Sequence, residues 1–193
     1  MEAQQKDAVA GEYYLQGVME TASGIQLKPD STFEFFYSYG ALDRYGSGKW
    51  SIANHSIELN SRTRPPLDFK LISGKKTAEN SITIKISDKN TNLLRYVLCI
   101  VKTKNGEHQQ MTNVEGIAQF PKEKADSVSL IFQWCPDRFS TFNINSDNNY
   151  FEFGFEPWIA EIFFEHFQLK IEKNKLTGKH PLMEGDNFRY VKD

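Results

Sequence analysis

The chain has 193 residues, of which 39% are hydrophobic and 25% are charged, as is ordinary for a folded protein. Its 23 basic residues are balanced by 25 acidic ones, and no long basic run occurs, which argues against a nucleic-acid-binding protein. No apolar run approaches the roughly 20 residues that a membrane-spanning helix needs. The aromatic share of 13% favours β structure, because aromatic side chains suit pleated, half-buried surfaces.

Residues 25–59 carry the clearest pattern, in which short alternating runs are separated by turn residues. Such a series is typical of an antiparallel meander. We expect a tight turn at residues 29–31 (Pro-Asp-Ser) and a hairpin tip at residues 54–55 (Asn-His). The strands expected in this first series lie at residues 13–19, 25–27, 32–39, 50–52, 57–59 and 69–71.

The run at residues 32–39 places aromatic side chains on one face of a strand, because successive side chains point to opposite faces. That face holds Phe33, Phe35, Tyr37 and Tyr39, whereas Glu34, Phe36 and Ser38 share the other face. In a small barrel, such a row either fills the interior or lines a site for one small ligand. We expect a filled interior. The alternative is a pocket for a ligand or partner, formed by Glu20, Tyr37, Tyr39, Asp43 and Arg44.

A polar stretch at residues 73–80 is predicted to link the first series to a second one. Isoleucine alternates with polar residues over 82–86, and an apolar strand is predicted over 95–102. An Asn-Gly pair at residues 105–106 marks a hairpin turn. Further strands are expected at residues 117–120, 128–134, 139–144 and 150–155.

The C-terminal part is compatible with two structures. Residues 159–167 fit the spacing of an amphipathic helix, but their many phenylalanines and the clear strand at 168–172 favour a strand for most of them. Residues 151–167 are also strongly aromatic around Trp158. This segment either packs two domains together, which we expect, or forms an exposed docking surface, for which Trp158 is the candidate residue.

Four stretches of the first series resemble the lipocalin-like barrels of bacterial envelope proteins. They are residues 11–13 (Gly-Glu-Tyr), 25–33 (Ile-Gln-Leu-Lys-Pro-Asp-Ser-Thr-Phe), 48–50 (Gly-Lys-Trp) and 57–59 (Ile-Glu-Leu). One such barrel, in an envelope-stress and copper-resistance lipoprotein family, carries a Cys-x-x-Cys motif between its first strands. The equivalent residues 18–23 contain no cysteine, so a copper role is not implied here.

The middle of the chain is similar to the transthyretin-like domain found beside carboxypeptidases and outer-membrane receptors. The resemblance is carried by residues 104–106 (Lys-Asn-Gly) and 112–120, where a Thr-Asn-x-x-Gly turn enters a strand; Asn113 stands where aspartate is usual. That family implies a sandwich with a structural or binding role and brings no catalytic residues.

The two resemblances together imply an all-β protein in which a sandwich is inserted into a barrel. We expect a disordered leader at residues 1–10, a lipocalin-like barrel or meander at 11–72 completed by 158–193, and a transthyretin-like β-sandwich at 81–157. The polar leader and the envelope resemblance favour an exported, periplasmic or extracellular protein whose signal peptide has been removed. A cytosolic protein with a frayed N-terminus is the alternative.

Signals for catalysis are weak. The four histidines, His55, His108, His166 and His180, show no metal-ligand spacing, and no nucleophile elbow, phosphate loop or dinucleotide motif occurs. No metal, cofactor or catalytic residue is therefore predicted. The acids nearest to aromatic residues are Glu20, Asp43, Glu161 and Glu165, and they keep a carboxylate-dependent hydrolase open as an alternative.

The sequence therefore favours a non-catalytic envelope protein that binds a partner protein or a small ligand. A structural accessory module without a ligand is the first alternative, and the hydrolase is the second. Cys99 and Cys135 are expected to be buried free thiols, although strands of one sandwich could bring them within bridging distance.

Overall fold

The computed structural model describes residues 2–193 and confirms an all-β protein, with 55% strand and 5% helix. The chain divides into two compact units. The first comprises the residues up to Arg64 together with Ala160–Asp193, and the second is the continuous segment Pro65–Ile159. The second unit is thus inserted between two strands of the first.

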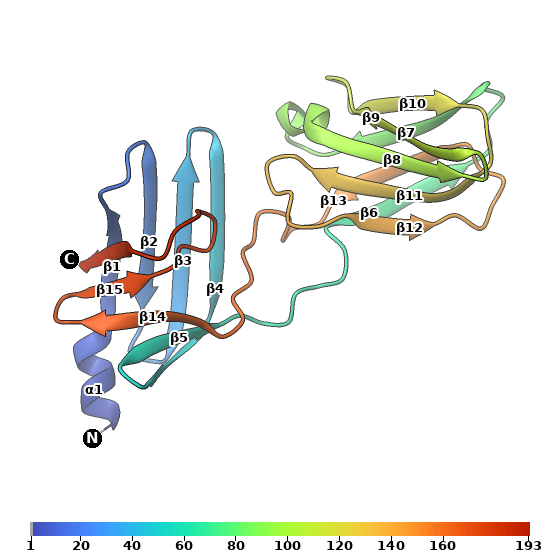
Figure 1. The fold of residues 1–193 in the computed structure, drawn as a ribbon. Helices are drawn as coiled ribbons and strands as arrows, with labels where there is room; N and C mark the ends of the chain where they lie inside the picture. The colour runs from blue at the N-terminus through green and yellow to red at the C-terminus, as the bar shows by residue number, and fades with distance from the viewer. Residues whose placement is uncertain (1) are drawn as a thin grey trace. The chain divides into compact units, whose positions relative to one another are not determined.

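The first unit is a closed barrel of eight antiparallel strands, in the order β1-β16-β15-β14-β5-β4-β3-β2 (Figure 1). Its strands are β1 (Gly11–Gln16), β2 (Thr21–Leu27), β3 (Thr32–Tyr39), β4 (Leu42–Ala53), β5 (Ser56–Asn60), β14 (Phe167–Glu172), β15 (Lys175–Gly178) and β16 (Phe188–Lys192). The predicted turns occur where expected: Ser31, Asn54 and His55 all have positive φ angles. The pairing of β1 with β16 closes the barrel without a free strand edge.

The barrel interior is filled by its own side chains. Alternate residues of each strand point inward, and large aliphatic and aromatic groups occupy these positions. Trp50 is 2% exposed, and its indole Nε1 donates a hydrogen bond of 2.9 Å to the carbonyl oxygen of Lys28. The buried set is Val9, Tyr13, Ile25, Leu27, Phe33, Phe35, Tyr37, Trp50, Ile57, Leu59, Ile162, Phe164, Leu169, Leu176 and Tyr190.

The expectation of a disordered leader is wrong for the described part of residues 1–10. Glu2–Val9 form a helix, α1, that precedes β1. Its last residue, Val9, is buried against the barrel core, and the Val9 carbonyl accepts a 2.6 Å hydrogen bond from the Tyr13 hydroxyl. The polar composition suggested disorder, but Val9 and this hydrogen bond attach the helix to the barrel, together with hydrogen bonds from Lys6 to the Ser31 hydroxyl at 2.8 Å and from Lys192 to the Ala8 carbonyl at 2.9 Å.

The segment 160–166 is neither the predicted strand nor a helix. It runs beside the first half of β4, where Glu161 forms an isolated parallel bridge with Tyr45, and the Ile162 amide donates to the Tyr45 carbonyl at 2.7 Å. β5 pairs only with the second half of β4, so this segment supplies the missing hydrogen-bond partners. It also inserts Phe164 into the core, where its ring meets Phe33 edge-on.

The second unit consists of two four-stranded sheets, with orders β10-β7-β13-β6 and β12-β11-β8-β9 (Figure 1). Only the pairing of β13 with β7 is parallel among the described strands. A 3₁₀ helix at Thr91–Tyr96 precedes β8. The strands are β6 (Phe69–Lys75), β7 (Ser81–Ser87), β8 (Val97–Thr103), β9 (Gly106–Met111), β10 (Ile117–Pro121), β11 (Ala125–Phe132), β12 (Ser140–Asn143) and β13 (Tyr150–Phe155).

Two expected boundaries differ from the structure. Phe69 and Leu71, predicted in the barrel, lie in β6, which pairs with β13 of the second unit; β6 also extends to Lys75, into the predicted linker. Trp158, which we grouped with the barrel-closing segment, belongs to the second unit as well. Alternation within a strand cannot show which distant strand it pairs with, so these two boundaries were misplaced.

The two sheets pack face to face through aromatic and aliphatic side chains. Phe132 of β11 and Phe155 of β13 have ring centroids 5.0 Å apart, and Phe142 of β12 lies 4.8 Å from Phe153 of β13. Cys99 and Cys135 are both buried and free, as expected. Burial raises the pKa of Cys99 to about 12, which keeps it a thiol.

The turn before β10 is organised by the side chain of Asn113 and by Gly116. Its side-chain oxygen accepts hydrogen bonds from the amides of Glu115 and Ile117, at 3.0 and 2.9 Å. Gly116 completes the turn with a φ of +77°, where an added side chain would meet the Ile86 carbonyl. A side-chain acceptor and a glycine therefore fix the conformation of this turn.

Candidate functional site

A row of apolar residues lies on the outer face of the barrel, where alternation would place polar side chains. Strand register puts its members directly side by side from β16 to β4: Val191, Tyr14, Gly24, Phe36 and Tyr45. The large side chains remain 37–46% exposed. Aromatic groups exposed in a continuous row are a feature of binding surfaces rather than of ordinary barrel exteriors.

Gly24 makes room for this row. A Cβ at position 24 would lie 2.5 Å from the ring of Phe36, so only glycine allows that ring to lie over β2. The rings of Phe36 and Tyr14 consequently approach to 6.3 Å between centroids, with 59° between their planes. The glycine thus converts two separate exposed rings into one tilted pair.

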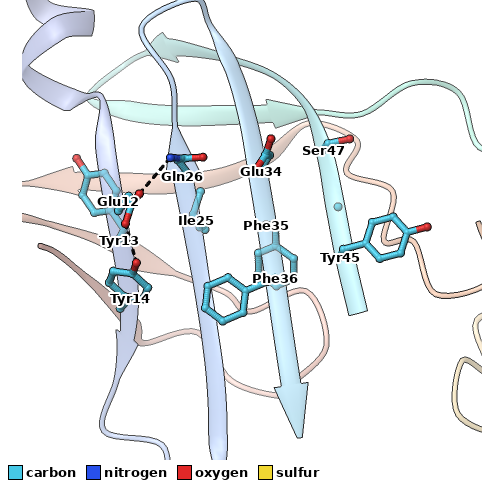
Figure 2. Close-up of a pocket in the computed structure, with 11 residues that line it drawn as sticks. Glu12, Tyr13, Tyr14, Ile25, Gln26, Glu34, Phe35, Phe36, Tyr45 and Ser47 are labelled. Atoms are coloured by element: carbon cyan, nitrogen blue, oxygen red, sulfur yellow. Dashed lines mark hydrogen bonds between the residues drawn. The ribbon is translucent and has the colours of Figure 1, made fainter. Parts of the chain in front are cut away.

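The row borders a pocket of about 510 Å³, which we call the aromatic groove (Figure 2). Figure 2 shows its two ends, with the rings of Tyr14, Phe36 and Tyr45 at one end and polar groups at the other. The volume is within the range of sites for small organic ligands. The side chains that define it are Glu12, Tyr14, Gln26, Glu34, Phe36, Tyr45 and Ser47.

The polar end is a second cross-strand row, which lies two residues along each strand from the aromatic row. Its members are Glu12, Gln26, Glu34 and Ser47. Glu12 accepts hydrogen bonds from the Tyr14 hydroxyl at 2.7 Å and from the Gln26 amide at 3.1 Å. Glu34 pairs with Lys28 outside the groove. The bond to Glu12 raises the pKa of Tyr14 above its ordinary value, which is already well above neutral pH, and the side chain is a neutral phenol.

Chemically, this arrangement can bind but is poorly suited to acid catalysis. Glu12 and Glu34 lie two strands apart on one face, as the carboxylates of a glycosidase could. Both, however, are exposed to solvent. A carboxyl group acts as a general acid when its surroundings shield it from water and raise its pKa. Among the described residues, no side chain covers the carboxylates of Glu12 and Glu34 from solvent.

A buried polar cluster inside the barrel superficially resembles a Ser-His pair. The Nε2 atom of His180 lies 3.3 Å from the Ser23 hydroxyl, and its Nδ1 accepts a 3.0 Å hydrogen bond from the Leu182 amide. Because Nδ1 is the acceptor, neutral His180 carries its proton on Nε2 and donates to Ser23. It therefore does not serve as a base toward that hydroxyl, which instead donates to the carbonyl of Phe36 at 2.9 Å.

His180 gives the barrel a pH dependence. Burial lowers its pKa to about 4, whereas an unfolded histidine titrates near 6.5. Between these values the unfolded chain binds a proton that the folded chain does not, so stability falls as the pH drops from about 6.5 to 4.

We expect the His180→Phe variant to lose less of its free energy of unfolding than the wild type over this pH range, as measured by urea unfolding at pH 7, 5.5 and 4.5. A His55→Asn control, on an exposed turn, should show the same loss as the wild type; equal pH profiles for the two variants would contradict the assignment.

The structure brings together only part of the predicted binding set. Glu20, Tyr39 and Asp43 are exposed near one end of the barrel, where Asp43 accepts a 2.6 Å hydrogen bond from Ser38. Tyr37 is buried inside the barrel, with its ring 5.3 Å from that of His180. None of these residues lines the aromatic groove.

Arg44 and Trp158, also predicted for binding, have structural contacts. Arg44 is 3% exposed and its guanidinium donates to the carbonyls of Ala160 and Glu161, which attaches the 160–166 segment to β4. Trp158 lies in the second unit, where its indole donates a 2.8 Å hydrogen bond to the Leu67 carbonyl. The burial of Arg44 is not visible in the sequence, because a buried arginine that satisfies main-chain carbonyls looks the same there as a residue at the rim of a pocket.

The sequence does not predict the groove residues, because the regularly aromatic face of residues 32–39 is the stronger pattern. The available signal was Phe36, an aromatic side chain between Glu34 and Ser38 on the otherwise polar face. Its alignment with Tyr14 and Tyr45 depends on strand register, which alternation alone does not fix.

Among the described residues, no group of three or more histidine, cysteine, aspartate or glutamate side chains is placed to hold a metal ion. Likewise, no helix within residues 2–193 has the length and apolar character to cross a membrane. The chain matches no protein-family model, no curated protein and no solved structure.

Proposed function

We propose that this protein is a non-catalytic binding protein that takes a ligand in the aromatic groove on the outside of its barrel. The observation that carries the proposal is the cross-strand row of Tyr14, Phe36 and Tyr45, exposed beside a 510 Å³ pocket. Exposing three large rings has no folding benefit, whereas a ligand that covers them gains their apolar surface.

The filled interior supports a site outside the barrel rather than within it. Lipocalin-type carriers hold ligands in the barrel cavity, but here the interior positions are occupied by large buried groups such as Trp50, Phe164 and Tyr190. A filled barrel alone would also suit a structural accessory module. The groove favours binding over that alternative, because a scaffold needs no exposed aromatic surface.

The second alternative, a carboxylate-dependent hydrolase, has some support in the shared position of Glu12 and Glu34. Their exposure weighs against it, as does the hydrogen bond that orients Glu12 toward Tyr14. Turnover of a model glycoside by the wild type, lost in Glu34→Gln, would establish the hydrolase and contradict the binding role.

We further propose that the first unit is a lipocalin-like barrel of the bacterial envelope and the second a transthyretin-like domain, which would place the protein in the periplasm or outside the cell. Support comes from the turn sequences at residues 25–33 and 112–120 and from the closed eight-stranded topology. Finding the native protein in the cytosolic fraction of its source cells would contradict the location.

The binding role can be tested with a neutral aromatic probe. We expect indole, titrated at millimolar concentrations into ¹⁵N-labelled protein, to cause saturable amide shifts around Tyr14, Gly24, Phe36 and Tyr45. The reason is that an aromatic probe can cover the exposed rings in an offset or edge-on arrangement. Two-dimensional ¹H–¹⁵N spectra report each position separately.

A matched pair of variants provides the control. The double variant Tyr14→Ser/Phe36→Leu should lose the saturable shifts, with leucine keeping apolar cover over Gly24 so that the fold is preserved. Tyr39→Ser removes an even more exposed ring outside the groove and should leave binding unchanged. Shifts scattered over the barrel surface, or unaffected by the double variant, would contradict the proposal.

A further inference from the structure

The charge of the aromatic groove is one-sided. Of its lining residues, only Glu12 and Glu34 carry charged side chains, and both are acidic. Lys28 neutralises Glu34 from outside the lining, whereas Glu12 has no ion-pair partner within the described residues. An occupant of the groove therefore meets an uncompensated carboxylate beside aromatic rings.

The ring geometry suits a cation. Attraction between a cation and an aromatic face extends to about 6 Å from the ring centroid. The centroids of Tyr14 and Phe36 are 6.3 Å apart and their planes are inclined by 59°, so one ammonium group seated over the place where the two rings meet can lie within this range of both centroids.

Glu12 lies next to this ring pair because the Tyr14 hydroxyl is hydrogen-bonded to one of its oxygens, Oε2, at 2.7 Å. The Gln26 amide holds the other oxygen, Oε1. These two bonds fix the carboxylate's orientation but use only part of its acceptor capacity, since a carboxylate has about four lone-pair sites. Glu12 therefore remains available to an ammonium group placed beside Tyr14, through a hydrogen bond where the ammonium carries an N–H and through charge attraction alone where it is quaternary.

We propose that the ligand of the aromatic groove is a small organic cation, an ammonium group carried on a compact apolar body. The ammonium lies over the place where the Tyr14 and Phe36 rings meet and faces Glu12, and the apolar body covers the rest of Phe36 and extends toward Tyr45. This inference rests on the proposed function, since it names the class of ligand for the same site.

A small molecule fits better than a segment of another protein. The pocket has about the volume of a small-ligand site. Its polar end and its aromatic end are only two residues apart along each strand. An amphipathic molecule of a few carbon atoms can reach both ends at once.

The test compares three molecules of nearly the same shape: choline, which is cationic, 3,3-dimethylbutan-1-ol, which is neutral, and 3,3-dimethylbutanoate, which is anionic. We expect choline to bind about five- to thirtyfold more tightly than the alcohol, as interaction with two rings implies. The carboxylate should bind most weakly of the three. Dissociation constants come from amide shifts of the groove residues.

Variants assign the preference to particular groups. Glu12→Gln should weaken choline binding about two- to fivefold, the range for an exposed charge pair, without affecting the alcohol. Phe36→Leu should reduce the choline-to-alcohol preference by a similar factor of about two to five, since one ring face is lost. Glu20→Gln removes an acid outside the groove and should change neither constant.

The outcomes separate this inference from the binding role itself. If the alcohol shifts the groove residues and choline binds no more tightly, the cation proposal is overturned and the binding role stands. If none of the three molecules, nor indole, binds there, both are overturned. A lysine-containing peptide that binds the groove when choline does not would replace the small cation with a protein partner.

Discussion

Replacing Trp50 with alanine is expected to cost about 3–5 kcal/mol of the barrel's free energy of unfolding. Trp50 is 2% exposed within the core, so the substitution leaves a large cavity among side chains that cannot collapse to fill it. It also leaves the Lys28 carbonyl without the hydrogen bond from the indole. Both effects act in the same direction.

The measurement is urea unfolding followed by amide signals assigned to each unit, because the two units need not unfold together. Tyr39→Ala is the matched control on a neighbouring strand, since its ring is 51% exposed; we expect a change within about 0.5 kcal/mol. A loss below about 1 kcal/mol for Trp50→Ala would show that its ring is not part of the barrel core.

The second large effect is expected in the other unit, where Asp68→Ala should destabilise the sandwich by about 2–4 kcal/mol. The Asp68 carboxylate is 3% exposed and binds Arg138 through two hydrogen bonds, of 3.0 Å to Nε and 2.6 Å to Nη2. Its removal leaves a guanidinium that is only 23% exposed without this partner. The cost is below that of a fully buried pair because water still reaches Arg138.

Asp68→Asn separates charge from hydrogen bonding, since it keeps one acceptor oxygen in place and should cost roughly half as much. Asp147→Ala is the control: it breaks an ion pair with Lys124 in which both side chains are more than half exposed, and little change is expected. Unfolding monitored by signals of the second unit measures each variant. An Asp68→Ala variant as stable as Asp147→Ala would refute the role of this pair.

Local alternation was enough to predict the fold class. Phe33 and Phe35 in β3, and Ile82, Ile84 and Ile86 in β7, are buried as their period of two predicted. The turn at residues 54–55 was also predicted correctly. These features depend on neighbours within a few residues, which a single sequence displays directly.

Features that depend on distant pairing were not predicted. The extended segment 160–166 is defined by its contacts with β4, more than a hundred residues earlier, and Arg44 is buried because of that segment. The site shows the same limitation: Tyr14, Phe36 and Tyr45 form one surface only because the register of three strand pairings aligns them around Gly24. A register shift of one residue would turn each ring to the other face.

The insertion of Pro65–Ile159 between β5 and β14 has a consequence for the order in which the two units can fold. The inserted unit is one uninterrupted stretch, so it can fold by itself, whereas the barrel requires β16 to pair with β1 across the whole insertion. Until that pairing forms, the first five strands are an open sheet with exposed edges, which invites pairing with other chains. Because of this topology, the folding protein is most exposed to aggregation before β14, β15 and β16 join the barrel.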